Sequence, residues 1–289
     1  MLSGSYTTLS NSSNYIGGIA GIVSNVSEDI INCHVINTSF STSANTTYFG
    51  GLFGALAAPC NISKCSAVDV EISHKYRYVG GLIGDVNLTG EATISDCYVK
   101  GGSINVGSTG SYSGGLIGYH ENGTLTVNRC YASNTVNGGF AIGGFAGFVK
   151  LSSITINNCA AWNGSVTAAS YGTKNWSSGA FTGVTHPNCH MTGNYRNPSM
   201  TLTAWWIPTA DYSHPDIDGT THPLVRISTD KSSYAETTLT TFNSTEGEAN
   251  RWAYHGKVES GKTLSQLAST TLGWSSDVWD FSESLPTLK

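Results

Sequence analysis

The sequence predicts an all-β fold: a right-handed parallel β-helix of about six or more coils, followed by an irregular C-terminal capping region. Three observations predict it. A glycine-rich motif recurs roughly every 30 residues, a polar residue and a cysteine follow each copy, and the composition is poor in charge. Charged residues make up 11% of the 289 residues, and the chain holds 34 glycines. Such a mixture favours short strands joined by turns over long surface helices.

The recurring motif is an aromatic residue, any residue and two glycines. Its copies are YIGGIAG from Tyr15, YFGGLFG from Tyr48, YVGGLIG from Tyr78, YSGGLIG from Tyr112, AIGGFAG from Ala141 and the degenerate SSGAFTG from Ser177. A period of about 20–50 residues indicates a solenoid or a propeller, and the short strands are too few for four-stranded blades. Three short strands per repeat are what a parallel β-helix needs, with coils about 4.8 Å apart. Glycine is expected where the chain bends sharply or where two coils approach closely.

Six of the seven cysteines follow a polar residue at one repeat position. These pairs are Asn32–Cys33, Lys64–Cys65, Asp96–Cys97, Arg129–Cys130, Asn158–Cys159 and Asn188–Cys189. We expect a ladder of free, buried thiols, because parallel neighbouring side chains seldom reach the disulfide dihedral. The remaining Cys60 leaves a local bridge to Cys65 as an alternative. Zinc is not expected, because no C-x-x-C pair occurs.

The G-G-[LIF]-x-G core with its cysteine-bearing strand resembles the GLUG repeat of bacterial surface proteins. The resemblance covers about Tyr15 to Tyr195. It implies an adhesin-like protein of the kind found in gut Bacteroidetes, or the stalk of an IgA-type metallopeptidase. The ending LGWSSDVWDFSESLPTLK is also similar to the segment that follows such repeats.

The C-terminal third differs in composition. Five of the seven prolines lie between Pro187 and Pro223, and the repeat signature disappears there. Because an open-ended β-helix leaves an unpaired edge, residues 196–289 are interpreted as coils and a cap packed on the end of a helix formed by residues 1–195.

Candidate binding residues fall in this capping region. Trp205 and Trp206 are adjacent, so on a strand one points inward while the other can bind a sugar or a protein, and Tyr212 is a further candidate. Packing of both tryptophans between cap and coil is the alternative. Asp216 and Asp218 share one face of an extended segment and are weak Ca²⁺ candidates beside the simpler interpretation as a polar loop.

The segment GKVESGKT, Gly256 to Thr263, matches the phosphate-binding loop of nucleotide triphosphatases. That loop needs a buried strand before it and a helix and a parallel sheet after it, and only 26 residues follow. Thr263 and Gln266 instead predict a capping box that opens a short helix. The match is interpreted as chance, and no cofactor is expected.

The net charge and the motifs that do not occur argue against several classes of function. A net charge of -5 disfavours nucleic acid, and no apolar run is long enough for a membrane span. Neither H-E-x-x-H nor G-x-S-x-G occurs, so no catalytic residue is assigned. The densest charged sets contain few carboxylates: Glu71, His74, Lys75 and Arg77, then Asp85, Glu91, His120 and Glu121.

The sequence therefore predicts a non-catalytic cell-surface or secreted adhesin-like protein that binds a host glycan or a surface or matrix protein. We expect a monomer or a part of a larger surface protein, without its signal peptide or anchor. A glycan-cleaving enzyme is the main alternative, and it requires two carboxylates about 5–9.5 Å apart in a groove. A passive stalk is the other.

Overall fold

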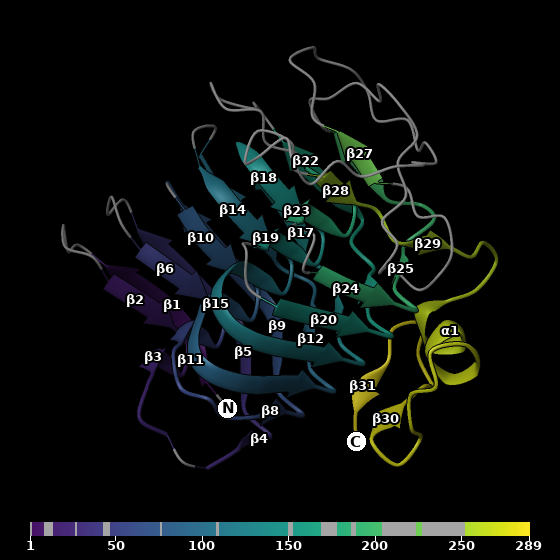
Figure 1. Cartoon of the computed structure of the whole chain (residues 1–289), viewed down its shortest axis with the longest axis horizontal. Helices are drawn as coiled ribbons and strands as arrows, with labels where there is room; N and C mark the ends of the chain where they lie inside the picture. Colours follow the sequence, from purple (N-terminus) through teal and green to yellow (C-terminus); the bar gives the residue numbers. More distant parts are fainter. Residues whose placement is uncertain are drawn as a thin grey trace.

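The computed structural model describes residues 2–8, 14–26, 28–42, 47–75, 77–107, 110–149, 153–168, 178–185, 189–203, 224–226 and 252–289. The described strands stack in parallel into a β-solenoid, as Figure 1 shows. They form five complete coils, and a sixth coil begins with a single bridge at Gly179. The predicted all-β, parallel β-helix fold is confirmed.

The first sheet holds the strands of the glycine motif. Its members are β2 (Asn14–Gly17), β6 (Thr47–Gly50), β10 (Arg77–Gly80), β14 (Ser111–Gly114) and β18 (Phe140–Gly143). Each pairs in register with the next, so that Gly17 opposes Gly50 and Gly80 opposes Gly114.

The second sheet takes the chain from the glycine motif to the cysteine step. It contains β3 (Ala20–Val23), β4 (Ile30–Ile31), β7 (Phe53–Leu56), β8 (Ile62–Ser63), β11 (Ile83–Ser95), β15 (Ile117–Asn128), β19 (Ala146–Val149), β20 (Ser153–Asn157), β23 (Thr182–Thr185), β24 (Cys189–Thr192), β27 (Leu224–Arg226) and β28 (Trp252–Tyr254). All its pairs are parallel except those that β28 makes with β23 and β27.

The third sheet completes each coil. It contains β1 (Leu2–Thr8), β5 (His34–Thr42), β9 (Ser66–His74), β12 (Tyr98–Lys100), β13 (Ser103–Val106), β16 (Tyr131–Ala132), β17 (Thr135–Gly138), β21 (Ala160–Ala161), β22 (Ser165–Ala168), β25 (Tyr195–Arg196), β26 (Thr201–Thr203) and β29 (Lys257–Val258). The hairpin β30 (Trp279–Asp280) and β31 (Thr287–Leu288) and the helix α1 (Leu264–Thr270) complete the described elements.

The core runs along the solenoid axis, because the same inward position is apolar in successive coils. One such column comprises Leu52, Leu82, Leu116, Phe145 and Phe181, all fully buried. The second glycine of each motif lies where two coils touch. A Cβ atom at Gly81 would lie 2.1 Å from the carbonyl oxygen of Gly115. The predicted need for glycine at close backbone contacts is confirmed at this position.

The polar residue before each ladder cysteine turns the chain with a left-handed backbone. Its φ lies between 50° and 59° at Asn32, Lys64, Asp96, Arg129 and Asn158. Asn and Asp tolerate this conformation better than most residues. The sixth coil uses Gly193, with φ of 64°.

The cysteines at this step form an interior ladder. The backbone N–H of each donates to the Sγ of the next, at 3.4 Å for Cys33 to Cys65 and for Cys97 to Cys130. In the sixth coil the Oδ1 of Asn194 takes the place of a sulfur, accepting from the Cys159 N–H at 2.9 Å. All seven cysteines are free thiols, so the alternative of a bridge between Cys60 and Cys65 is not realised.

The assignment of Cys189 to the ladder is wrong. This residue pairs with Ile154 on β20, five residues before the ladder position at Cys159. Gly193 and Asn194 occupy the turn instead. The following tyrosine was the available signal, because Asn194–Tyr195 matches Cys97–Tyr98 and Cys130–Tyr131.

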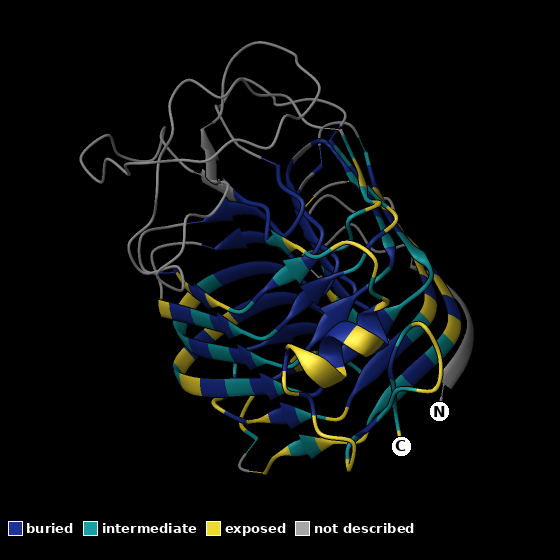
Figure 2. Ribbon diagram, turned by 90° about the vertical axis from the view of Figure 1, so that its right-hand side faces the viewer, coloured by how far each residue is buried: buried dark blue, intermediate teal, exposed yellow. Residues whose placement is uncertain are grey.

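The end of the chain returns along the side of the solenoid. Strand β28 pairs with β23 and β29 pairs with β25, which places both on the sixth coil. Residues 264–289 then lie beside β12, β16 and β21 rather than over the end of the core (Figure 1). In Figure 2 the face of α1 turned to the strands is buried and its outer face is exposed.

Candidate functional site

The binding and metal candidates of the capping region are Trp205, Trp206, Tyr212, Asp216 and Asp218. All five lie outside the described residues. The candidate site is therefore built from surfaces of the described coils.

The segment that matches a phosphate-binding loop is described, and it has another role. Lys257 and Val258 pair with the solenoid as β29, and Thr263 is the N-cap of α1. Thr263 Oγ1 accepts from the N–H of Gln266, whose side chain accepts from the N–H of Thr263. The predicted capping box is confirmed. The strand before α1 pairs with a coil of the solenoid, and Lys262 forms an ion pair with Glu259.

The outer side of the third sheet carries a regular polar surface, which we call the polar face. It consists of Ser39, Ser41, Glu71, Ser73, Ser103, Asn105, Thr135, Asn137, Ser165, Thr167 and Thr201. Glu71 is the only charged side chain of this set. The residues that alternate with them, such as Ile72 and Ile104, are buried in the core. Figure 2 shows this alternation of exposed and buried residues along the strands nearest the N-terminus.

Hydrogen bonds within and between coils join neighbouring side chains of the polar face. Asn137 Nδ2 donates to Asn105 Oδ1 at 2.9 Å, and Asn105 Nδ2 donates to Ser103 Oγ at 2.7 Å. Ser103 Oγ donates in turn to a carboxylate oxygen of Glu71. Strand geometry sets the rows about 4.8 Å apart across coils and about 6.6 Å apart along a strand. The result is a lattice of hydroxyl and amide groups with fixed spacing, which suits a polymer that bears many hydroxyl groups.

A stack of tyrosines lines the edge between the first and second sheets. Tyr15, Tyr48, Tyr78 and Tyr112 stack ring on ring, with centroids 4.8, 4.7 and 5.3 Å apart. Because each ring covers the face of the next, the inner rings have no free face for a sugar. The signal in the sequence is the tyrosine that opens each of the first four copies of the glycine motif.

Two carboxylates, Asp85 and Glu121, raise the pKa of tyrosines in and beside this stack. Burial, together with the nearby charges of Asp85 and Glu121, raises the pKa of Tyr48 to about 12. Burial and Glu121 likewise raise the pKa of Tyr119. Both phenols stay protonated at neutral pH, so neither supplies the deprotonated oxygen that a tyrosine base would need.

The charged residues between Glu71 and Arg77, the densest such set in the sequence, do not form one cluster in the structure. Glu71 lies on the polar face, His74 is buried, and the Arg77 guanidinium lies 5.7 Å from the centroid of the Tyr112 ring. Within the described ranges, no group of three or more His, Cys, Asp or Glu side chains has metal-binding geometry.

Two buried histidines are expected to make the free energy of unfolding depend on pH. Burial lowers the pKa of His74 and of His120 to about 4, from an ordinary value near 6.5. The unfolded chain therefore binds more protons than the folded one between about pH 4 and pH 6.5, and stability is lost as the pH falls through that window. Each histidine contributes on the order of 3 kcal/mol to this loss.

We expect the urea midpoint to fall between pH 7 and pH 4.5, and His120→Gln to flatten that fall. Lys75 is exposed, so Lys75→Gln changes a nearby side chain without removing a buried histidine and is the matched control. An equal slope in wild type and His120→Gln would contradict the assignment.

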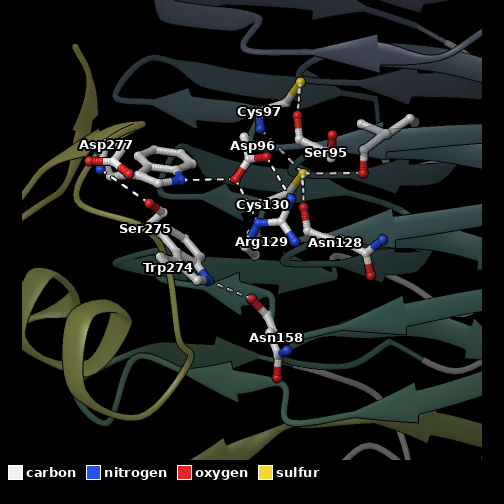
Figure 3. A network of polar contacts seen from close by, with 12 residues as sticks. Ser95, Asp96, Cys97, Asn128, Arg129, Cys130, Asn158, Trp274, Ser275 and Asp277 are labelled. Atoms are coloured by element: carbon white, nitrogen blue, oxygen red, sulfur yellow. Dashed lines mark hydrogen bonds and ion pairs between the residues drawn. The ribbon is translucent and has the colours of Figure 1, made fainter.

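The C-terminal segment is held to the side of the solenoid by two indoles (Figure 3). Trp274 Nε1 donates to the carbonyl oxygen of Asn158 at 2.8 Å, and Trp279 Nε1 donates to Asp96 Oδ1 at 3.1 Å. Asp96 also accepts two hydrogen bonds from Arg129, at 2.8 and 2.7 Å. The segment thereby covers Tyr98 and Tyr131, so a ligand cannot reach the part of the third sheet that β12, β16 and β21 form.

Comparison with known proteins supports no family assignment. No protein-family model and no curated protein matches the sequence. Among solved structures, the chain is similar to a putative immunoglobulin A1 protease from Bacteroides ovatus, with 16% identity and a TM-score of 0.47. The match covers 91% of this chain and 74% of that chain. At this level of similarity no function is transferred, and the β-solenoid is established by its own strand pairing.

The described part of the chain also contains no helix that is long and apolar enough to cross a membrane. Its one described α-helix, α1, has seven residues.

Proposed function

We propose that the protein is a non-catalytic adhesin-like β-solenoid that binds an extended, uncharged glycan on the polar face. The observation that carries this proposal is the ordered lattice of hydroxyl and amide side chains across successive coils of the third sheet. The GLUG-like repeat is consistent with a bacterial surface or secreted setting, and there the ligand would be a host glycan.

The physical argument rests on matched periodicity. A polysaccharide presents hydroxyl groups at regular intervals, and the rigid coils present partners at regular intervals with little entropy to lose. Each hydrogen bond contributes only about 0.5–1.5 kcal/mol, so useful affinity needs many of them in parallel. The scarcity of charge on the polar face favours a neutral polymer over a sulfated or uronic acid polymer.

The test is a glycan screen with two matched triple variants. Asn105→Ala, Asn137→Ala and Thr167→Ala together remove three neighbouring members of one column of the polar face. Thr93→Ala, Thr126→Ala and Thr155→Ala remove three neighbouring members of a column on the outer side of the second sheet, where these residues pair in register. We expect the first variant to bind the selected glycan about 10- to 100-fold more weakly, and the control to bind like wild type.

Circular dichroism and the midpoint of thermal unfolding confirm that both variants are folded. Equal binding by wild type and the polar-face variant, or the absence of any glycan ligand, would refute the proposal. The same reactions are assayed for new reducing ends, because turnover of the bound glycan would identify an enzyme instead.

A further inference from the structure

The polar face is long in one direction and narrow in the other. It runs across β5, β9, β13, β17, β22 and β26, which pair in parallel one after another. Five steps of about 4.8 Å between neighbouring strands give it a length of about 24 Å. Each strand contributes at most two members, such as Ser103 and Asn105 of β13, which lie about 6.6 Å apart.

The register of the strands arranges these side chains in two columns. In the first column, Glu71 lies between Ser39 and Ser103 of the neighbouring coils. In the second column, Asn137 lies between Asn105 and Thr167. A ligand that follows the columns therefore meets hydroxyl or amide groups again at each coil.

A chain of hydrogen bonds fixes the orientation of the side chains at the centre of this face. A carboxylate only accepts hydrogen bonds, so Ser103 donates its hydroxyl hydrogen to Glu71. Ser103 Oγ then accepts from Asn105 Nδ2, and Asn105 Oδ1 accepts from Asn137 Nδ2. Beyond these bonds, each of the two amides has a further N–H and a further oxygen lone pair. Together they match a sugar hydroxyl group, which both donates and accepts.

The shape of the face favours one direction for a bound chain. Each net hydrogen bond raises the affinity by roughly 2- to 10-fold. A glycan that lies along a strand meets only the two columns, so its affinity stops increasing after about two sugars. A glycan that lies along the solenoid axis meets a new strand at every coil, and the gains multiply over the length of the face.

We propose that the bound glycan lies along the solenoid axis with one sugar at each coil, and that it is a β-1,4-linked chain of neutral pyranose sugars. This inference rests on the function proposed above and adds a direction, a repeat length and a linkage to it. A β-1,4 linkage between equatorial oxygens keeps the chain extended, and each sugar advances it by close to one coil spacing. An α-1,4 linkage winds the chain into a helix, which lifts hydroxyl groups away from a flat sheet.

The first experiment measures how affinity depends on chain length. Calorimetry compares β-1,4-linked glucose and mannose oligosaccharides of two to eight sugars with α-1,4-linked glucose oligosaccharides of the same lengths. For at least one β-1,4 series, we expect the affinity to rise at least about 2-fold with each sugar up to about six, and then to level off. The α-1,4 chain of six sugars should bind at least about 10-fold more weakly.

The second experiment places an obstacle in the middle of the polar face. Asn137→Arg puts a long side chain on β17, so that only β5, β9 and β13 remain continuous on one side of it. The rise in affinity should then stop at about three sugars. Thr126→Arg is the matched control, because Thr126 is also half-buried and lies in the same coil, but on the second sheet. This control should keep the wild-type dependence on length.

The outcomes separate this inference from the proposed function. Affinity that stops rising at two sugars, equal binding of the α-1,4 and β-1,4 chains, or an unchanged length dependence in folded Asn137→Arg would overturn the axial arrangement and leave a glycan ligand in place. Binding of another glycan from the screen, without binding of either β-1,4 series, would do the same. If no glycan binds, both proposals fail. If Asn137→Arg does not fold, the length series and the linkage comparison with wild type decide.

Discussion

Replacing Gly81 with alanine is expected to lower the free energy of unfolding by about 2–4 kcal/mol. The new Cβ atom would lie 2.1 Å from the Gly115 carbonyl oxygen and 2.9 Å from side-chain atoms of Val99 and Asn134. Neither backbone segment can move away, because each is hydrogen-bonded to a further coil. The urea midpoint and the thermal midpoint measure the loss.

Gly164 is the control for this substitution. A Cβ atom there meets nothing within 4 Å, and its φ lies outside the left-handed region. Gly164→Ala should therefore keep wild-type stability or gain up to about 1 kcal/mol, because the unfolded chain loses freedom. Equal stability of the two variants would show that the coils adjust their spacing, contrary to the close packing of this corner.

Replacing Trp279 with alanine is expected to cost about 3–5 kcal/mol of local stability. Trp279 is fully buried, and its ring lies 4.6 Å from that of Trp274 and 5.9 Å from that of Tyr98, measured between centroids. Its loss leaves a cavity and an unfilled acceptor on Asp96. The solenoid core does not include this cluster, so the effect should be confined to residues 264–289.

Limited proteolysis distinguishes this outcome from global unfolding. Trp279→Ala should be cleaved within residues 264–289 while the coils remain resistant. Trp279→Phe keeps most of the apolar contact and loses only the indole N–H, so it should lose about 1–3 kcal/mol. Cleavage of the coils at the same rate as the C-terminal segment would contradict the separation of the two clusters.

The repeat makes the solenoid predictable from the sequence, whereas residues 264–289 contain no repeated pattern. Glycines at fixed spacing and a cysteine after a polar residue identify equivalent positions in each coil, and stacking follows from their equivalence. Residues 264–289 lack such equivalence. Their position depends on contacts between Trp279 and Asp96, which lie 183 residues apart in the sequence. Local pattern carries no information about that pairing.

The candidate site is less predictable from the sequence for a related reason. Rare residues such as Trp205 and Trp206 stand out in the sequence, but they lie outside the described residues. The polar face is built from common residues, Ser, Thr and Asn, and is visible only when strands place them in register. The tyrosine stack is similar, because Tyr48 or Tyr78 alone resembles an ordinary strand residue.

The contact between Trp279 and Asp96 also fixes which coil the C-terminal segment docks against. Lys64, Asp96, Arg129 and Asn158 occupy the same turn in successive coils, and their backbones are alike. A slip of the C-terminal segment by one coil would place Lys64 or Arg129 against the indole N–H, and both side chains offer only hydrogen-bond donors. Docking shifted by one coil therefore leaves the Trp279 indole N–H without its acceptor. Residues 264–289 thereby check the register of the coils that precede them in the chain.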